Sequence, residues 1–279
     1  MIDITGLTVV SEGKCVLDNI NAHINKGDFA VIFSSDAETG HALIHSIMEY
    51  SRDYKGSIKV NCGMKNVRYV PDDILWEEFS TAREYLCMVA RNSGNYDISM
   101  QENFCDKLNI KMDEKLLDMT FEENKLVQII AALCSKPELL IFDMPQSFLS
   151  SPVKTIIYGM LKEFHSVGTT IVVVCDSYEE LKTYCNRYIY IKEGSVAADG
   201  YVSDEDIRKR VITVQGHKSE SLISVLGPFI GEKNGRSSYL YDYDIRRIPD
   251  ILGRLECDDY LIEELSLEEE INSDYSRWE

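Results

Sequence analysis

The fold of this chain is decided by one stretch of sequence, Val31-Ile32-Phe33-Ser34-Ser35-Asp36-Ala37-Glu38-Thr39-Gly40-His41-Ala42-Leu43-Ile44. An apolar run at 29–33 predicts a buried strand, and apolar residues at helical spacing after Gly40 predict a helix near 41–52. A strand, a short polar loop and a helix together form the setting in which backbone N–H groups hold a phosphate. The usual pattern there is G-x-x-x-x-G-K-[ST]. This chain keeps the spacing but has Ser35, Gly40, His41 and Ala42 at the defined positions.

Composition and charge exclude several classes of protein. At 279 residues, 44% hydrophobic and 27% charged, the chain has an ordinary globular composition and is long enough for a large domain and a small one. Its apolar runs are too short to span a bilayer and its N-terminus does not read as a signal peptide, so we expect no direct membrane insertion. The net charge of −18 argues against nucleic acid as a partner. The eight cysteines form no C-x-x-C pair, which predicts reduced thiols rather than disulfides or a metal site.

Short strands separated by turns open the chain, and alternating strands and helices follow. Residues 1–24 predict antiparallel strands, and residues 77–135 are mostly helical by periodicity. Further strands are expected at 56–60, 66–70, 139–142, 170–174 and 187–191, with helices at 152–164 and 178–186. This alternation predicts an α/β fold whose mostly parallel sheet is covered on both faces.

Residues 206–279 are expected to form a separate small unit. Strands and helices are expected there in the order βαββαβ, at 210–214, 220–226, 229–233, 238–243, 245–255 and 260–265. The Asn234-Gly235 pair predicts a hairpin turn between the second and third of these strands. This order is typical of a ferredoxin-like or similar α+β unit, and the acidic run at 263–270 is expected to be a solvated face.

Five short sequences lie in a characteristic order along the first three quarters of the chain. They are Val16-Leu17-Asp18-Asn19-Ile20, Ile24-Asn25-Lys26-Gly27-Asp28, Val67-Arg68-Tyr69-Val70-Pro71-Asp72, Lys136-Pro137-Glu138-Leu139-Leu140-Ile141-Phe142-Asp143-Met144-Pro145 and Lys192-Glu193-Gly194-Ser195-Val196. Their order and spacing over residues 1–205 resemble the ATP-binding subunit of an ATP-binding cassette (ABC) transporter. The resemblance implies the ABC-type P-loop nucleotide-binding-domain fold, with an antiparallel N-terminal sheet and a helical subdomain at about 77–135. The tail Glu264-Leu265-Ser266-Leu267-Glu268-Glu269 is similar to the C-terminal extension of drug- and peptide-exporter subunits.

Most positions that contact nucleotide in this family hold other residues here. In the family the Walker A lysine contacts the terminal phosphates and the next hydroxyl binds Mg²⁺, whereas this chain has His41 and Ala42. The other matching positions hold Asp143 (the Walker B aspartate), Met144 (the catalytic glutamate), Asp176 (the switch histidine) and Asp72 (the Q-loop glutamine). Methionine cannot accept a proton from water, so no residue is assigned a catalytic role.

The family's signature motif, LSGGQ, falls on Met119-Thr120-Phe121-Glu122-Glu123. Its two glycines let the backbone approach the nucleotide held by the opposite subunit, and Phe121 and Glu122 obstruct that approach by bulk and by charge. Cassette subunits pair head to tail, so each site uses Walker A of one chain and the signature of the other. Every composite site that contains this chain is therefore expected to be impaired.

The resemblance thus implies a degenerate cassette subunit, a pseudo-ATPase with little or no ATP hydrolysis. It would dock on a multi-span membrane permease, pair as a homodimer or heterodimer with an ABC ATPase subunit, and lie in the cytoplasm at the membrane. ATP and Mg²⁺ are expected to bind weakly if at all, with Asp143 the one candidate metal contact. Two alternatives stay open: a functional ABC transporter ATPase with unorthodox motifs, and a soluble regulatory or scaffold protein.

Two narrower expectations concern particular surfaces. The family docks its permease near a segment of the helical subdomain that here contains Ile74, Leu75, Trp76 and Phe79. In the loop, Asp36 or Thr39 is expected to cap the helix with a side-chain oxygen, in the place that a phosphate would otherwise take.

Overall fold

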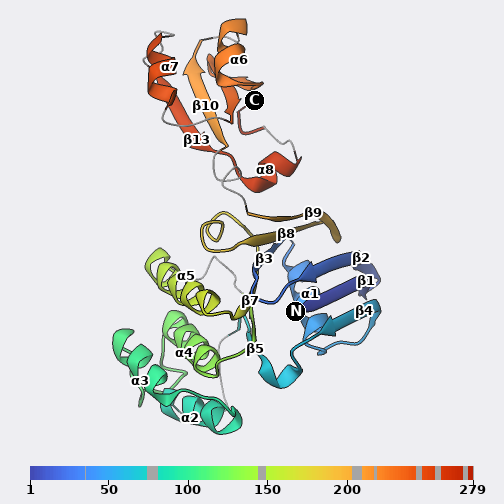
Figure 1. Ribbon diagram of the computed structural model, residues 1–279, viewed down its shortest axis with the longest axis vertical. Coiled ribbons are helices and arrows are strands. Elements are labelled where there is room, and N and C mark those ends of the chain that lie inside the picture. Colours follow the sequence, from blue (N-terminus) through green and yellow to red (C-terminus); the bar gives the residue numbers. More distant parts are fainter. Residues whose placement is uncertain are drawn as a thin grey trace. The chain divides into compact units, whose positions relative to one another are not determined.

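The structure is a computed structural model that describes residues 1–34, 36–73, 81–143, 149–202, 209–216, 219–242, 247–254, 259–272 and 276–278 (Figure 1). The chain divides into two compact units, Met1–Tyr201 and Val202–Glu279, whereas the sequence places the boundary between residues 205 and 206. Among the described residues, no helix is long and apolar enough to cross a membrane.

A six-stranded sheet forms the centre of the first unit. Its strands are β3 (Phe29–Phe33), β5 (Val67–Val70), β6 (Leu139–Asp143), β7 (Thr170–Cys175), β8 (Arg187–Lys192) and β9 (Ser195–Tyr201). They lie in the order β5-β6-β7-β3-β8-β9, and all neighbours are parallel except β8 and β9. Every residue of β3, β6 and β7 is buried, which explains why these strands are continuous apolar runs in the sequence.

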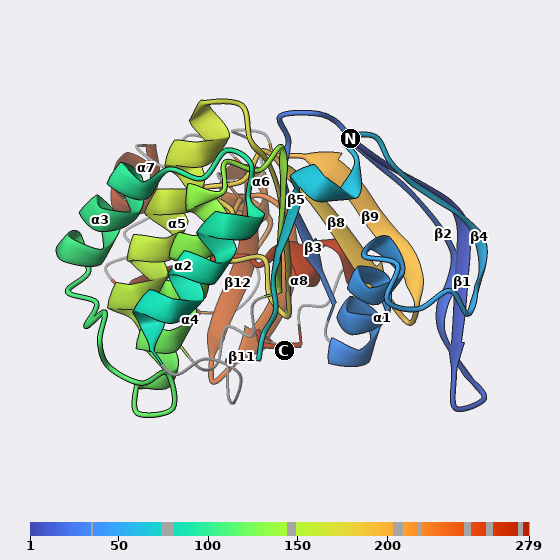
Figure 2. The same cartoon turned by 90° about the horizontal axis from the view of Figure 1, so that it is seen from below.

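The two faces of this sheet carry different elements (Figure 2). On one face lies α1 (Ala37–Ile47), and beyond it an antiparallel sheet in the order β2-β1-β4, formed by β1 (Ile2–Ser11), β2 (Lys14–Ile24) and β4 (Tyr54–Val60). Leu43, Ile44 and Ile47 of α1 share one apolar core with both sheets. A short 3₁₀ turn, η1 (Met64–Asn66), precedes β5.

The other face is covered by helices of the segment that the sequence predicts to be helical, and by the helix that follows β6. They are α2 (Ala82–Asn92), α3 (Ile98–Lys107), α4 (Phe121–Cys134) and α5 (Ser151–Ser166) (Figure 2). The expected α/β fold, with a mostly parallel sheet, an antiparallel N-terminal sheet and helices on both faces, is confirmed.

One expected helix of this unit is wrong. Residues 178–186 form turns, closed by hydrogen bonds from Leu181 N to Tyr178 O (2.9 Å) and from Cys185 N to Leu181 O (3.0 Å). The ring of Tyr178 is buried and stacks on Phe33 with 5.5 Å between ring centroids. Because this anchor fixes the path of a short connection between two strands, tertiary packing takes precedence over the helical pattern of the sequence.

The second unit has the order βαββαβ followed by a short helix. Its elements are β10 (Arg210–Gln215), α6 (Glu220–Leu226), β11 (Phe229–Lys233), β12 (Arg236–Tyr241), α7 (Ile248–Arg254), β13 (Tyr260–Glu264) and α8 (Leu267–Asn272). The sheet order is β11-β12-β10-β13 with all neighbours antiparallel, which is a split βαβ arrangement. Asn234 and Gly235 have φ of 55° and 73°, so the predicted hairpin turn is confirmed.

Candidate functional site

The N-terminus of α1 occupies the place where a phosphate-binding loop was expected. The helix begins at Ala37 rather than near His41, so the expected start is wrong. Asp36 is the N-cap residue, and its carboxylate accepts a hydrogen bond from the N–H of Glu38 at 3.0 Å. Capping by Asp36 is confirmed, whereas Thr39 lies buried within the helix. An N-cap aspartate followed by an acidic residue in the first turn favours helix at these positions, which explains the earlier start.

Gly40, the one residue that matches a loop glycine, lies inside α1 and packs against the sheet. A Cβ atom added there would lie 2.9 Å from Cγ1 of Val174 on β7. Ala42, at the position of the metal-binding hydroxyl, is partly buried against the core shared by both sheets. Both residues therefore serve the packing of α1, and Ser35, the first position of the pattern, lies outside the described residues.

Three side chains that are distant in the sequence meet beside this helix. His41 of α1 has its Nε2 atom 3.6 Å from Oδ2 of Asp72, which follows β5, and 3.8 Å from Oδ2 of Asp143 at the end of β6. One donor atom from each of the three residues lies within 4.8 Å of the others. The structure thus brings together the Walker A, Q-loop and Walker B positions that the sequence identifies.

The Asp143 carboxylate is the most buried group of this cluster. Its side chain is 8% exposed, compared with 30% for Asp72 and 45% for His41. Burial raises the pKa of Asp143 to about 6, with His41 acting in the opposite direction and Asp72 adding to the rise. The hydroxyl of Tyr69 donates a hydrogen bond to Asp143 Oδ2 at 3.4 Å.

A buried lysine beside the cluster was missed by the sequence analysis. Lys125 of α4 is 2% exposed, and its Nζ atom donates to the backbone carbonyl oxygens of Pro71, Asp72 (2.9 Å) and Asp73 (2.9 Å). Gln128, one turn further along α4, also donates to Asp73 O at 3.1 Å. Burial lowers the pKa of Lys125 to about 8, although nearby carboxylates act to raise it.

This lysine holds the segment at the Q-loop position against the helical subdomain. A charged residue at the start of an otherwise apolar helical run is the one signal that would have drawn attention to it. Its partners are backbone carbonyls more than fifty positions earlier in the chain, and no local pattern indicates them.

The signature position forms the N-terminus of α4. Thr120 and Glu123 make a reciprocal capping box, in which each side chain bonds the backbone of the other. Oε1 of Glu122 accepts a hydrogen bond from the backbone N–H of Ser150 at 2.5 Å, which ties α4 to the N-cap of α5. Phe121 lies beneath Lys125 Nζ, 5.6 Å from the ring centroid. The residues at the signature position thus contact groups of α4 and the N-cap of α5, and none of them belongs to the His41 cluster.

The remaining predicted positions do not join the cluster. Asp176 follows β7 and is exposed, and it is not among the three residues whose donor atoms converge. Met144, at the catalytic glutamate position, lies outside the described residues, as do the proposed permease contacts Ile74, Leu75, Trp76 and Phe79.

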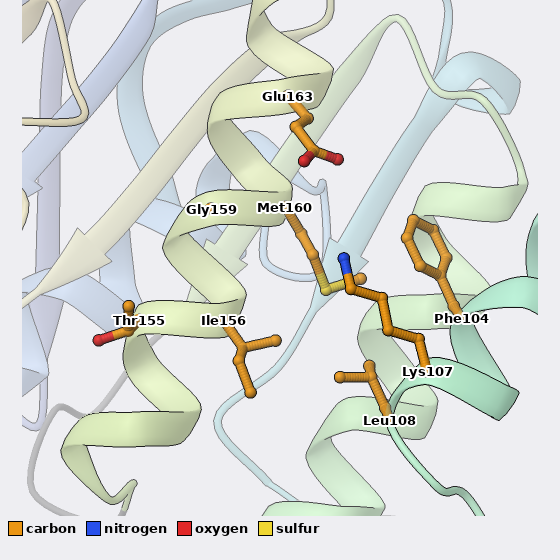
Figure 3. Close-up of a pocket in the computed structure, with 8 residues that line it drawn as sticks. All are labelled: Phe104, Lys107, Leu108, Thr155, Ile156, Gly159, Met160 and Glu163. Atoms are coloured by element: carbon orange, nitrogen blue, oxygen red, sulfur yellow. The ribbon is translucent and has the colours of Figure 1, made fainter.

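A hollow of about 320 Å³ lies elsewhere, between α3 and α5. Phe104 and Lys107 reach into it from α3, and Ile156 and Met160 from α5, with Glu163 at its rim (Figure 3). None of the predicted site residues lines this hollow, so it is separate from the cluster at His41.

Two sheets enclosing α1, with a helical segment on the opposite face, define the ABC ATPase nucleotide-binding-domain fold. A solved ATP-binding subunit of an ABC transporter matches with a TM-score of 0.64 at 18% identity, covering 75% of this chain and 92% of that one. A nucleotide-free ATP-binding cassette from an ABC transporter matches with a TM-score of 0.62 at 16% identity, covering 73% and 92%.

The sequence comparisons agree with the fold, although no protein-family model matches the chain. The chain is 24% identical over 268 residues to the Nod factor export ATP-binding protein I of Sinorhizobium fredii (strain NBRC 101917 / NGR234), covering 88% of this chain and 78% of the relative. It is 21% identical over 243 residues to a phosphonates import ATP-binding protein of Hydrogenovibrio crunogenus (strain DSM 25203 / XCL-2), covering 77% and 89%. The resemblance to ATP-binding subunits of ABC transporters is confirmed.

Proposed function

We propose that this chain is a cassette subunit of an ABC transporter that hydrolyses little or no ATP and acts by docking on a membrane permease or pairing with an active ATPase subunit. The observation that carries the proposal is the N-terminus of α1. There the Asp36 carboxylate bonds the helix N–H of Glu38, so an anion of the protein takes the place that a phosphate would need.

The charge around this helix supports the same conclusion. Glu38 lies in the first turn, and Asp72 and Asp143 lie beside His41, so four carboxylates surround the region. Lys14 contacts Asp36 at 3.7 Å and Glu38 at 3.6 Å, but it is exposed and already shared between the two. A nucleotide triphosphate would meet carboxylates where the family presents an ammonium group and a metal.

The missing contacts set the size of the effect. A hydrogen bond to a charged group contributes about 1.5–3 kcal/mol. Without the lysine ammonium and the hydroxyl that holds Mg²⁺, binding loses about 3–6 kcal/mol, or about 10²–10⁴-fold in affinity.

Calorimetric titration of the purified chain with MgATP tests this proposal. At about 1 mM nucleotide, the upper end of the usual range for enzyme substrates, we expect no saturable binding. The double variant His41→Lys, Ala42→Thr returns the ammonium and the hydroxyl, and it is expected to bind more tightly than the natural chain. Submillimolar binding by the natural chain would contradict the proposal.

An active ATPase with unorthodox residues is the second candidate, because Asp143 is retained at the end of β6 and meets His41 and Asp72. This candidate predicts ATP hydrolysis by the chain together with its permease, and loss of that hydrolysis in Asp143→Asn. If ATP turnover does not exceed that of the permease preparation alone, this second candidate is excluded.

Membrane co-purification separates a transporter subunit from a soluble scaffold. A transporter subunit is expected to bring a multi-span protein with it from detergent-solubilised membranes, and a scaffold is not. The Trp76→Ala variant is expected to weaken this association without lowering the melting temperature, since the family docks its permease at this segment.

A further inference from the structure

The side chains of His41, Asp72 and Asp143 form a group of possible metal ligands to which a nucleotide does not have to contribute. They come from three separate elements: α1, the residues after β5, and the end of β6. The imidazole nitrogen lies 3.6 Å and 3.8 Å from the two carboxylate oxygens. His41 and Asp143 belong to regular elements, and Asp72 lies two residues after β5, so the fold brings the three residues together.

The two distances from His41 to the carboxylates are close to those in a site for a small transition-metal ion. Zinc binds imidazole nitrogen and carboxylate oxygen at about 2.0–2.2 Å in tetrahedral geometry, which places the donor atoms about 3.3–3.5 Å apart. Rotamer adjustments of a few tenths of an ångström bring the His41 contacts into that range, and the two carboxylate oxygens, which lie within 4.8 Å of each other, converge on the same ion. Three protein ligands leave the fourth position for water, as in open zinc sites.

The burial of the Asp143 carboxylate also favours a cation at this place. The Asp143 side chain is 8% exposed, and among the described residues its one hydrogen bond is the long contact from Tyr69 at 3.4 Å. Lys125 directs its Nζ atom to the carbonyls of residues 71–73 and forms no ion pair with Asp143 within the described part of the chain. Buried charges in proteins are normally paired or bound to metal, and among the described residues Asp143 forms an ion pair only with His41, at 3.8 Å.

The donor types select among metals. Mg²⁺ prefers six oxygen donors in octahedral geometry and gives up its water reluctantly, so an imidazole in the set disfavours it. Imidazole nitrogen and carboxylate oxygen are both ligands of Zn²⁺. The side chains of His41 and Asp72 are 45% and 30% exposed, so solvent reaches two of the three donors.

We propose that His41, Asp72 and Asp143 bind one divalent ion of the Zn²⁺ class in the absence of nucleotide. The histidine at the lysine position supplies a metal ligand in place of a phosphate contact. This inference needs neither a nucleotide nor a permease, so it stands or falls independently of the proposed function.

The test uses the full chain after chelator treatment, with exposed thiols alkylated because Cys15 and Cys87 also bind soft metals. Calorimetry with Zn²⁺ alone and visible absorption with Co²⁺ alone are each expected to show one site per chain. His41→Ala and Asp143→Asn are each expected to weaken binding at least about tenfold, since loss of even an outer-shell partner of a metal ligand typically costs about 10–100-fold.

His23→Ala is the matched control. His23 is also exposed and also contacts an aspartate, Asp3, but the described residues place no second carboxylate in its donor set. We expect this variant to bind Zn²⁺ as the natural chain does. Equal binding by His41→Ala and the natural chain, an equal loss in His23→Ala, or Mg²⁺ binding as tight as Zn²⁺ would each overturn the proposal.

Independent readouts separate loss of ligand from loss of fold. Each variant is checked by its melting temperature without metal, and His41→Ala is expected to fold normally because the side chain is 45% exposed. Zn²⁺ is then expected to raise the melting temperature of the natural chain and not that of His41→Ala. MgATP titrations of the same samples report on the proposed function alone.

Discussion

The substitution Gly40→Ala tests whether this residue, at the position of a phosphate-loop glycine, is needed for the packing of α1 against the sheet. In Gly40→Ala the new Cβ would lie 2.9 Å from Cγ1 of Val174, whereas carbon atoms pack best at about 3.5–4.0 Å. Val174 is buried in β7, and a valine side chain has little rotamer freedom with which to move away. The substitution therefore has to overpack the interface between α1 and the sheet.

Two opposing terms set the magnitude. Replacing glycine by alanine inside a helix contributes about 1 kcal/mol of stability, and overpacking a core costs about 1–3 kcal/mol. The net expectation for Gly40→Ala is a loss of about 1 kcal/mol. For a unit of this size that lowers the melting temperature by about 2–4 °C.

Gly159→Ala is the matched comparison within the same unit. Gly159 lies inside α5, and an added Cβ would meet no atom within 4 Å. Only the helix-propensity term applies there, so we expect a gain of about 1 kcal/mol and a higher melting temperature. Both variants are measured by urea unfolding and calorimetry without nucleotide or metal. If Gly40→Ala stabilises the protein as much as Gly159→Ala, the reasoning about packing is refuted.

Three further predictions concern a cap, a loop contact and a thiol. Asp36→Ala is expected to lower the free energy of unfolding by about 1 kcal/mol, whereas Asp36→Asn keeps an acceptor and should stay near the natural value; equal losses in urea unfolding would contradict this. Glu122→Gln exchanges a charged acceptor for a neutral one at 2.5 Å from a backbone N–H, and a loss of about 0.5–1 kcal/mol is expected in the same assay. A thiol reagent at pH 8 should modify exposed Cys15 and spare buried Cys134, whose pKa is raised by burial to about 12. The folded state keeps the Cys134 proton, whereas an unfolded thiol releases it near its ordinary pKa of 9.0. The stability contributed by Cys134 is therefore complete below about pH 9 and is lost as pH rises toward 12. Rapid labelling of Cys134 in the folded protein would show that this thiol is not buried.

Patterns in the sequence predict the buried strands and the hairpin well. The apolar runs at 29–33, 139–142 and 170–174 correspond to β3, β6 and β7, because strands buried on both faces need no polar residues. Asn234-Gly235 specifies its own turn through two positive φ angles. Both signals are local, so the sequence contains all of the information that they need.

The site was predictable only in part, because its details depend on contacts across the fold. Motif spacing identifies His41, Asp72 and Asp143 as related positions, and the parallel strands then bring them together. The start of α1 was missed because the sequence offers Asp36 and Thr39 as alternative caps, and only the structure shows which of them accepts a bond from a helix N–H. Lys125 was missed because its three acceptors are backbone atoms in another segment.

The carboxylates near the first turn of α1 have a consequence for how solutes approach the protein. Asp36, Glu38, Asp72 and Asp143 lie in a chain of net charge −18, so a polyanion meets an unfavourable potential before it makes any contact. Added salt shortens the range of that repulsion. Whatever weak affinity the chain retains for nucleotides should thus increase with ionic strength, the reverse of the trend at a site that attracts phosphate by positive charge.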